Sequence, residues 1–285
     1  MTIAVTFLPR NAATPLPPIA FIGGGNMASA IIGGLLRQGT LASTFEVVEP
    51  FDEARTRLAS EFGIAALTEA GPALARCAVV VWAVKPQTFS GAAQPVRAFA
   101  PDALHLSVAA GITSDSIARW LGSERIVRAM PNTPALIGQG MTGVFARPAT
   151  SSEDRALVVQ LLAPTGELLW VDTEINLDAV TAMSGSGPAY VFYFIEAMTE
   201  AGVEMGLPAD QAQRLAIGTF TGASALAKGA TEAPSVLRQR VTSKGGTTYA
   251  AITSLETADV KAQFKTAIRA AQKRAAELGE EFGNS

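Results

Sequence analysis

The chain has very few of the residues that form disulfides and metal sites. Among its 285 residues there is one cysteine, Cys77, and one histidine, His105. One cysteine excludes an internal disulfide and a cysteine-cluster metal site, and one histidine excludes a multi-histidine metal site. A histidine-based catalytic triad would depend wholly on His105. Both residues stand in apolar surroundings, so we expect Cys77 to be a buried, inert thiol and His105 to be a structural histidine of the core.

Aromatic residues and net charge are scarce as well. Aromatics make up 7% of the chain against 48% for all apolar types, so the core must consist mainly of Ala, Val, Leu and Ile. The formal net charge is −3 without a basic stripe, which argues against nucleic acid as a partner. Every long apolar stretch is interrupted by Gly, Pro or a charge before it reaches membrane-spanning length. Residues 1–18 lack the pattern of a signal peptide, so we expect a flexible N-terminal extension and a cytoplasmic protein.

The most informative segment of the chain is a glycine-rich turn. The apolar run Ile19–Ile22 leads into Gly23–Met27, and a helix-compatible stretch continues to about Arg37. In a strand–turn–helix of this kind, Gly23 fits the tight turn and Gly25 lets the backbone approach a pyrophosphate. The helix N-terminus adds free N–H groups and a positive dipole end. The segment therefore predicts a dinucleotide site; a glycine-rich loop without a ligand is the alternative.

The rest of the first half alternates short apolar runs with helical patterns. Strands are expected at 19–22, 45–48, 78–84, 104–108, 126–130 and 142–146. This alternation predicts a Rossmann-type, doubly wound parallel sheet. After Trp170 the strand patterns stop, and Ala-rich helical stretches follow. We therefore expect a dinucleotide-binding domain at 19–175 and an all-helical domain at 176–285, whose many apolar residues favour homodimerisation over a self-contained bundle.

Ligands of doubly wound sheets bind at the carboxyl ends of the strands, where this chain has short segments rich in Gly, Pro and polar residues. Glu49, directly after the second strand, can accept hydrogen bonds from a ribose hydroxyl, which favours NAD. Arg55 and Arg57 on the following helix can compensate for the 2′-phosphate of NADP. The preference between the two cofactors therefore stays open.

A second glycine cluster, at 241–248, precedes a helix that begins near Tyr249. Consecutive glycines and threonines at a helix start form an anion nest, which a small carboxylate would fit. An ordinary capped helix is the alternative, because Thr247 or Thr248 could serve as the cap.

Five segments carry a family resemblance. They are 21–27 (FIGGGNM), 83–87 (AVKPQ), 128–134 (RAMPNTP), 181–190 (TAMSGSGPAY) and 241–248 (VTSKGGTT). From Ile19 to about Ala275 the chain resembles the pyrroline-5-carboxylate reductase family, which catalyses the last step of proline biosynthesis. The resemblance implies a helical domain that interlocks with its partner in a homodimer, commonly assembled into a ring of five dimers. It also implies hydride transfer from NADPH or NADH to the C=N carbon of 1-pyrroline-5-carboxylate.

The resemblance assigns site residues as well. The cofactor would lie over Gly23, Gly24, Gly25, Asn26, Met27, Ala83, Val84, Lys85, Pro86, Val108, Ala109, Ala110 and Asn132. Glu49 is a further candidate for cofactor binding because it directly follows the second strand. The substrate would contact Ser184, Gly185, Ser243, Gly245, Gly246, Thr247 and Thr248. Thr248 matches a hydroxyl that approaches the ring nitrogen, and Glu174 matches an acidic position near the substrate, so these two are the catalytic candidates. A protonated imine already carries the positive charge that hydride transfer removes, so no strong base is required.

The chain departs from the family pattern at four places, and two other functions stay in view. One of these places is the segment 67–70 (LTEA), which lacks an Asn often found before the third strand. Lys244 stands where the family usually has Pro, Arg240 where many members have Asn or Asp, and Glu49 where NADPH-using members often have Ser or Asn. A β-hydroxyacid dehydrogenase-like oxidoreductase would carry a catalytic lysine on the helix after its second glycine motif, and residues 191–196 contain none. A non-catalytic dinucleotide sensor would be expected to lose the nest at 245–248, which is intact.

Overall fold

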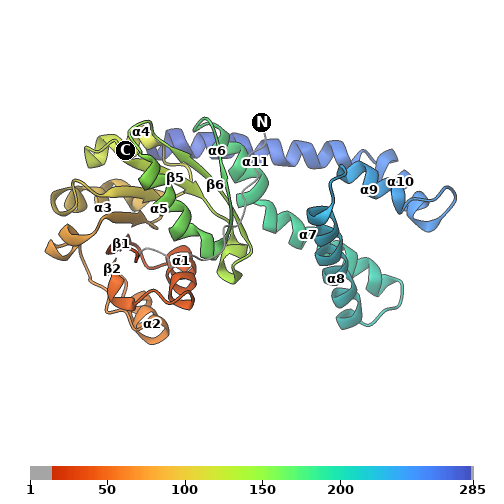
Figure 1. The fold of residues 1–285 in the computed structure, drawn as a ribbon. Coiled ribbons are helices and arrows are strands. Elements are labelled where there is room, and N and C mark those ends of the chain that lie inside the picture. The colour runs from red at the N-terminus through yellow and green to blue at the C-terminus, as the bar shows by residue number, and fades with distance from the viewer. Residues whose placement is uncertain (1–14, 284–285) are drawn as a thin grey trace. The chain divides into compact units, whose positions relative to one another are not determined.

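The computed structural model describes residues 15–283, which form two compact units. The first unit comprises the chain up to Glu174 together with its end from Glu281, and the second comprises Ile175–Glu280. Most of the expected N-terminal extension, residues 1–14, lies outside the described residues. The first unit contains all the strands of the described chain, and the second is helical (Figure 1).

The first unit is built on a seven-stranded sheet in the order β2-β1-β3-β4-β5-β6-β7. Its strands are β1 (Ile19–Ile22), β2 (Phe45–Val48), β3 (Val79–Trp82), β4 (Leu104–Ser107), β5 (Ile126–Met130), β6 (Gly140–Ala146) and β7 (Gly166–Trp170). Strands β1 to β5 pair in parallel, which confirms the predicted doubly wound sheet. The chain runs from β1 to β2 and then crosses to β3 on the other side of β1. The strand order therefore reverses at β1, where ligands of such sheets bind.

The far edge of the sheet differs from the expected arrangement. Strand β6 runs antiparallel to β5, because the link between them holds only the 3₁₀ turn Thr133–Ile137 and is too short for a parallel crossover. Strand β7 pairs in parallel with β6 and is a strand that the sequence patterns did not predict. Its residues alternate between partly buried and exposed, so it lacks the continuous apolar run of an inner strand.

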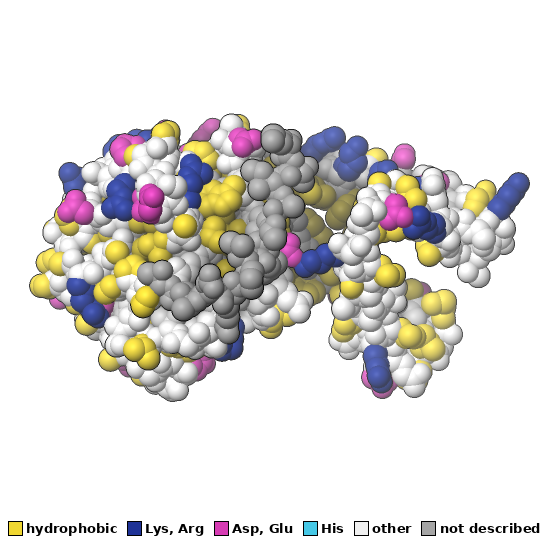
Figure 2. Space-filling model, in the orientation of Figure 1, with side chains coloured by type: hydrophobic (Ala, Val, Ile, Leu, Met, Phe, Trp, Pro, Cys, Tyr) yellow, Lys and Arg dark blue, Asp and Glu magenta, His cyan; other side chains and the backbone are white. Residues whose placement is uncertain are grey.

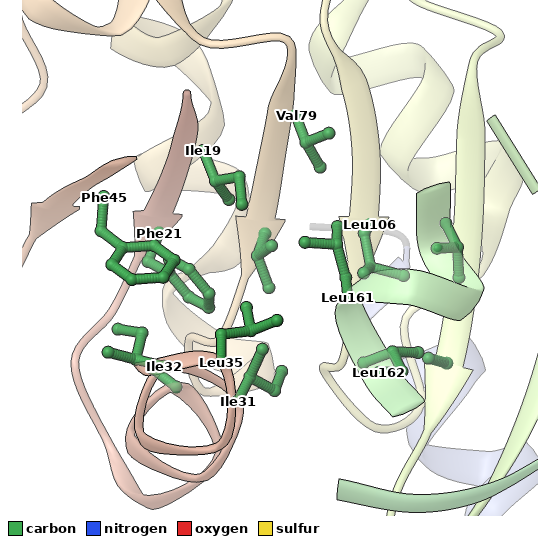
Figure 3. Close-up of a cluster of buried hydrophobic side chains, with 14 of the residues drawn as sticks. Ile19, Phe21, Ile31, Ile32, Leu35, Phe45, Val79, Leu106, Leu161 and Leu162 are labelled. Atoms are coloured by element: carbon green, nitrogen blue, oxygen red, sulfur yellow. The ribbon is translucent and has the colours of Figure 1, made fainter. Parts of the chain in front are cut away.

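Helices cover both faces of the sheet. Helices α1 (Asn26–Arg37), α2 (Asp52–Phe62) and α5 (Ser152–Leu162) pack on one face, and α3 (Pro86–Phe99) and α4 (Ser114–Leu121) pack on the other. Successive strand residues point to opposite faces. In β1, Ile19 and Phe21 therefore join the α1 side (Figure 3), while Ala20 and Ile22 belong to the cluster under α3 and α4.

The second unit consists of helices. They are α6 (Asn176–Val180), α7 (Gly187–Glu204), α8 (Ala209–Gly229), α9 (Pro234–Arg240), α10 (Thr247–Thr257) and most of α11 (Val260–Gly283). Helices α7 and α8 approach closely, since a Cβ added at Gly202 would lie 2.8 Å from the Cβ of Ala212. The rings of Tyr190 and Phe194 on α7 meet Phe264 of α11, with centroids 5.7 and 5.5 Å apart. These contacts pack the helices against one another but bury few large apolar side chains.

Large apolar side chains of the second unit lie largely in the open. Among its described residues, the fully buried apolar ones are Leu177, Ala182, Ala212, Ala216 and Ala275. By contrast, Phe192 is 64% exposed, Tyr193 is 67% exposed and Leu226 is 76% exposed, and apolar patches are visible on these helices (Figure 2). Exposed apolar surface of this extent is typical of protein interaction sites. Within residues 15–283, no helix combines the length and apolar character needed to cross a bilayer.

Candidate functional site

The glycine-rich turn is packed against the ends of two neighbouring strands. The N–H of Gly23 donates to the carbonyl of Val48 at the end of β2, 2.8 Å away. The φ of Gly23 is +95°, and a Cβ there would lie 2.5 Å from the carbonyl oxygen of Ala83, the first residue after β3. Only glycine fits this position. The same contact brings Ala83 and Val84, two predicted cofactor residues, against the turn.

Helix α1 presents an open N-terminus directly after the turn. It begins at Asn26 with Gly25 as its N-cap, no side chain caps it, and its first turn contains no acidic residue. Gly25 and Asn26 are exposed, and no atom lies within 4 Å of a Cβ built on Gly25. The N–H groups of the first turn are therefore accessible to an anion such as a pyrophosphate.

The other predicted cofactor residues lie at the same edge of the sheet, because β1, β3, β4 and β5 are parallel. Lys85 and Pro86 form the start of α3, where Lys85 is exposed. Val108 to Ala110 follow β4, and the N–H of Val108 donates to the carbonyl of Trp82 at 3.0 Å. The side-chain oxygen of Asn132, after β5, accepts from the N–H of Met141 at 3.0 Å and holds the turn between β5 and β6.

The carboxylate of Glu49 faces into the glycine-rich turn. One oxygen accepts from the N–H of Gly24 at 2.7 Å, and the other accepts from the N–H of Phe51 at 2.9 Å. Glu49 is only 5% exposed. The sequence places this acid correctly after β2, but the hydrogen bonds to the turn depend on its side-chain direction, which sequence position does not give.

Two arginines of α2 donate to main-chain carbonyls next to this carboxylate and in the glycine-rich turn. Arg55 donates to the carbonyls of Glu49 and Pro50 at 3.0 and 2.7 Å, and it forms an ion pair with Asp52 at 3.0 Å. Arg57 donates to the carbonyl of Gly24 at 3.0 Å, and its buried Nε has no hydrogen-bond partner. The positive charge around the turn thus comes from the helix that follows β2.

Glu174 is held inside the first unit by three hydrogen bonds. Its carboxylate accepts from the N–H and the hydroxyl of Ser114, each at 2.5 Å, and from the guanidinium of Arg128 in β5 at 2.6 Å. Arg147 also donates to the Ser114 hydroxyl at 3.1 Å. Sequence reasoning missed the roles of Arg128 and Ser114. A charged residue inside an apolar strand was the available indication for Arg128, because a buried arginine needs a partner.

In the second unit, Ser184 and Gly185 lie in the π-helical turn Thr181–Gly185 between α6 and α7. The N–H of Ser186 donates to the carbonyl of Thr181 at 2.8 Å. Pro188 has no N–H, so the normal helical ladder cannot continue through it. Turns of this kind occur frequently at functional sites.

The second glycine cluster forms the open start of helix α10. Gly245 has a φ of +78°, and the N–H of Gly246 donates to the carbonyl of Ser243 at 3.0 Å. The N-cap is Gly246, and neither Thr247 nor Thr248 caps the helix with its side chain. Among the described residues the Thr248 hydroxyl has no hydrogen-bond partner. The first-turn N–H groups and this hydroxyl are thus accessible to a ligand, as an anion nest requires.

The histidine and the cysteine have structural surroundings. The indole N–H of Trp82 donates to Nδ1 of His105 at 3.2 Å, and His105 is 1% exposed. Burial, and to a lesser degree the charge of Arg125, lowers the pKa of His105 to about 4. Burial also raises the pKa of Cys77 to about 11, which keeps it a thiol. Both findings agree with the expectation of a core histidine and an inert thiol.

Comparison with known proteins gives a consistent set of similarities. A family model described as pyrroline-5-carboxylate reductase dimerisation matches residues 174–278, and one described as NADP oxidoreductase, coenzyme F420-dependent, matches residues 18–111. The chain is 45% identical to a pyrroline-5-carboxylate reductase of Pseudomonas aeruginosa, covering 94% of this chain and 98% of that protein. It is 41% identical to one of Haemophilus influenzae, over 91% and 97% of the two chains.

Two solved structures are similar along their whole length. A pyrroline-5-carboxylate reductase from Coxiella burnetii aligns with a TM-score of 0.85 at 35% identity, over 92% of this chain and 98% of that chain. The pyrroline carboxylate reductase of Plasmodium falciparum, solved with NADP bound, aligns with a TM-score of 0.84 at 26% identity, over 94% and 100%.

Proposed function

The chain belongs to the pyrroline-5-carboxylate reductase family, and we propose that it reduces 1-pyrroline-5-carboxylate to L-proline with a hydride from NADPH or NADH, the last step of proline biosynthesis. The observation that carries the proposal is the 45% identity to the Pseudomonas aeruginosa protein over 98% of its length. The open turns at Gly23–Met27 and Gly245–Thr248 supply what this reaction needs, one for a dinucleotide and one for a small carboxylate.

The reduced nicotinamide supplies the hydride when it is bound. The chain's part is to hold it, and the first unit fits that task on two observations. The close contact between Gly23 and Ala83 leaves no room for a side chain in the turn, and the N-terminus of α1 is uncapped by any side chain. The proposed set also includes Gly24, Gly25, Asn26, Met27, Glu49, Val84, Lys85, Pro86, Val108, Ala109, Ala110 and Asn132.

The substrate carboxylate would bind the nest formed by Ser243, Gly245, Gly246 and Thr247, and Ser184 and Gly185 would contact the substrate from their π-helical turn. Thr248 would donate its hydroxyl hydrogen bond to the ring nitrogen, since that hydroxyl has no partner within residues 15–283. Because the protonated imine already carries a positive charge, orientation and exclusion of water are enough for hydride transfer. Glu174 is better suited to anchoring than to proton transfer, because both of its oxygens are bonded to Ser114 and Arg128.

The proposal is tested by initial rates with pyrroline-5-carboxylate and with NADPH and NADH in parallel. Thr248→Ala should lower kcat/KM roughly tenfold to a hundredfold, the effect of one hydrogen bond to a charged group. Thr257→Ala, at the other end of α10, is the matched control, because its hydroxyl bonds only within the helix. Absence of turnover with both cofactors would refute the reductase assignment, and an unchanged rate in Thr248→Ala would refute the role of Thr248.

We also propose that the second unit assembles as a homodimer, with a ring of five dimers as the further state. Support comes from the match to a dimerisation model and from the exposure of Phe192 and Tyr193. Light scattering after size exclusion should give at least twice the chain mass of 29.5 kDa. Phe192→Glu should shift the mass toward that of one chain, and a monomer of the unaltered protein would refute the proposal.

A further inference from the structure

The cations beside the glycine-rich turn have unequal partners. Arg55 is paired with the carboxylate of Asp52 at 3.0 Å. Arg57 makes one hydrogen bond, to the carbonyl of Gly24 at 3.0 Å, and among the described residues it has no carboxylate partner. Its Nε is buried without any hydrogen bond. Although the buried Nε is closed to a ligand, the terminal nitrogens of Arg57 make only this one bond and keep further N–H groups for an anion, and phosphate is the anion whose geometry a guanidinium matches best.

Glu49 is poorly placed to bind a ribose. A carboxylate that recognises ribose hydroxyls must present its oxygens to the ligand. Here both oxygens accept main-chain N–H bonds, from Gly24 and Phe51, and the residue is 5% exposed. Arg55 also donates to the main-chain carbonyl of Glu49 at 3.0 Å, which fixes the backbone that carries this side chain. We therefore expect Glu49 to stabilise the glycine-rich turn, and the arginines of α2 to provide the charge that meets a dinucleotide.

Resting on the proposed dinucleotide site, we propose that Arg57 rather than Glu49 sets the choice of nucleotide, and that it selects a nucleotide with a phosphate on the adenosine 2′-oxygen. Arg57 lies at the Gly24 carbonyl, one residue before the Gly25 N-cap, so it stands beside the segment expected to hold the dinucleotide. A 2′-phosphate would supply the acceptors that its guanidinium lacks. A 2′-hydroxyl supplies no charge, so the gain from Arg57 would be lost with NADH.

The test uses the full-length chain and measures binding rather than turnover. Calorimetric titration with 2′,5′-ADP and with 5′-AMP isolates the 2′-phosphate, because the two ligands differ only in that group. NADPH and NADH are titrated alongside as the complete pair. The unaltered chain should bind 2′,5′-ADP and NADPH at least tenfold more tightly than their counterparts. Arg57→Gln should weaken binding of these two ligands roughly tenfold to a hundredfold and change the others less than twofold. Arg57→Lys, which keeps the charge but not the fork, should fall between.

Two controls make the result specific. Arg155→Gln removes the same charge from an exposed arginine of α5, whose guanidinium lies over the ring of Trp170 in β7. This variant should change neither the affinity for NADPH nor that for NADH. Glu49→Gln should lower the melting temperature of the chain while keeping the preference for the 2′-phosphate.

Three results would overturn the inference. The first is that Arg57→Gln weakens the binding of NADPH and NADH equally, which would assign Arg57 to the pyrophosphate or to the turn alone. The second is that the unaltered chain binds NADH more tightly than NADPH. The third is a loss of NADH binding that occurs only in Glu49→Gln. A chain that prefers NADPH yet does not reduce pyrroline-5-carboxylate would refute the proposed reaction and leave this inference standing.

Discussion

Replacing Glu174 by glutamine distinguishes a structural anchor from a catalytic acid. The Glu174 carboxylate bonds to Ser114 and forms a 2.6 Å ion pair with Arg128. The Arg128 side chain is 9% exposed and that of Glu174 is 24% exposed, so the pair is mostly removed from water. Removing one member of a buried pair costs about 3–5 kcal/mol. The partial exposure of Glu174 reduces the expected loss to about 2 kcal/mol of unfolding free energy.

For a chain of this size, that loss corresponds to a fall in Tm of about 4–8 °C. Thermal and urea unfolding of Glu174→Gln should be measured beside kcat/KM, with the exposed Glu69→Gln as the control. A double-mutant cycle with Arg128→Met should return a coupling energy of about 1–3 kcal/mol. An unchanged Tm together with a large fall in kcat would refute the anchoring argument and make Glu174 a catalytic residue.

Three further predictions follow from packing and titration. The pKa of His105 is about 4 in the folded chain against an ordinary 6.5, so the unfolded chain binds the proton more readily and stability falls as pH drops from about 6.5 to about 4. Urea unfolding at pH 7 and 4.5 should differ by about 2–3 kcal/mol from this source, and His105→Gln should remove that difference. Gly34→Ala should destabilise the fold by about 1–3 kcal/mol, because its Cβ would lie 2.7 Å from Pro164. Gly91→Ala, in open space within α3, should instead stabilise the fold by about 0.5–1 kcal/mol. Equal melting temperatures of the two variants would contradict this packing argument. Gly23→Ala should abolish nucleotide binding in the same titrations, and retained affinity would show that the turn can relax around a side chain.

The sequence predicts the parallel strands β1 to β5 well and the far edge of the sheet, formed by β6 and β7, poorly. The predicted bounds of β1, β2 and β5 are those of the structure, because β1 is a continuous apolar run and β2 and β5 are each apolar except for one charged residue. Strand β7 is half exposed and carries Glu167 among its apolar residues, so no such run marks it. The reversal of β6 follows from the length of its link to β5, a feature that strand patterns alone do not report.

In the candidate site, the sequence predicts where a residue lies along the chain but not which way its side chain points. The positions of Gly23 and Gly25 follow from a short motif. Gly23 has a local geometric reason in its positive φ and its contact with Ala83, whereas the space at Gly25 is open for the approach of a ligand. Glu49 and Glu174 are acidic residues whose sequence positions suggest ligand contacts. Their partners, Gly24 at 25 residues' separation and Ser114 at 60, are brought to them only by the folded sheet. Long-range pairing of this kind decides the role of a carboxylate, and a single sequence does not contain it.

The second unit has one leucine and four alanines as its fully buried apolar side chains. So small an interior contributes little of the free energy that must offset the conformational entropy of ordering more than a hundred residues. We expect the remaining stabilisation to come from surfaces that a second copy of the chain covers, which makes the concentration of the chain itself a thermodynamic variable. We therefore expect dilution to lower the melting temperature of the second unit, because it shifts the equilibrium toward chains whose apolar surfaces are uncovered.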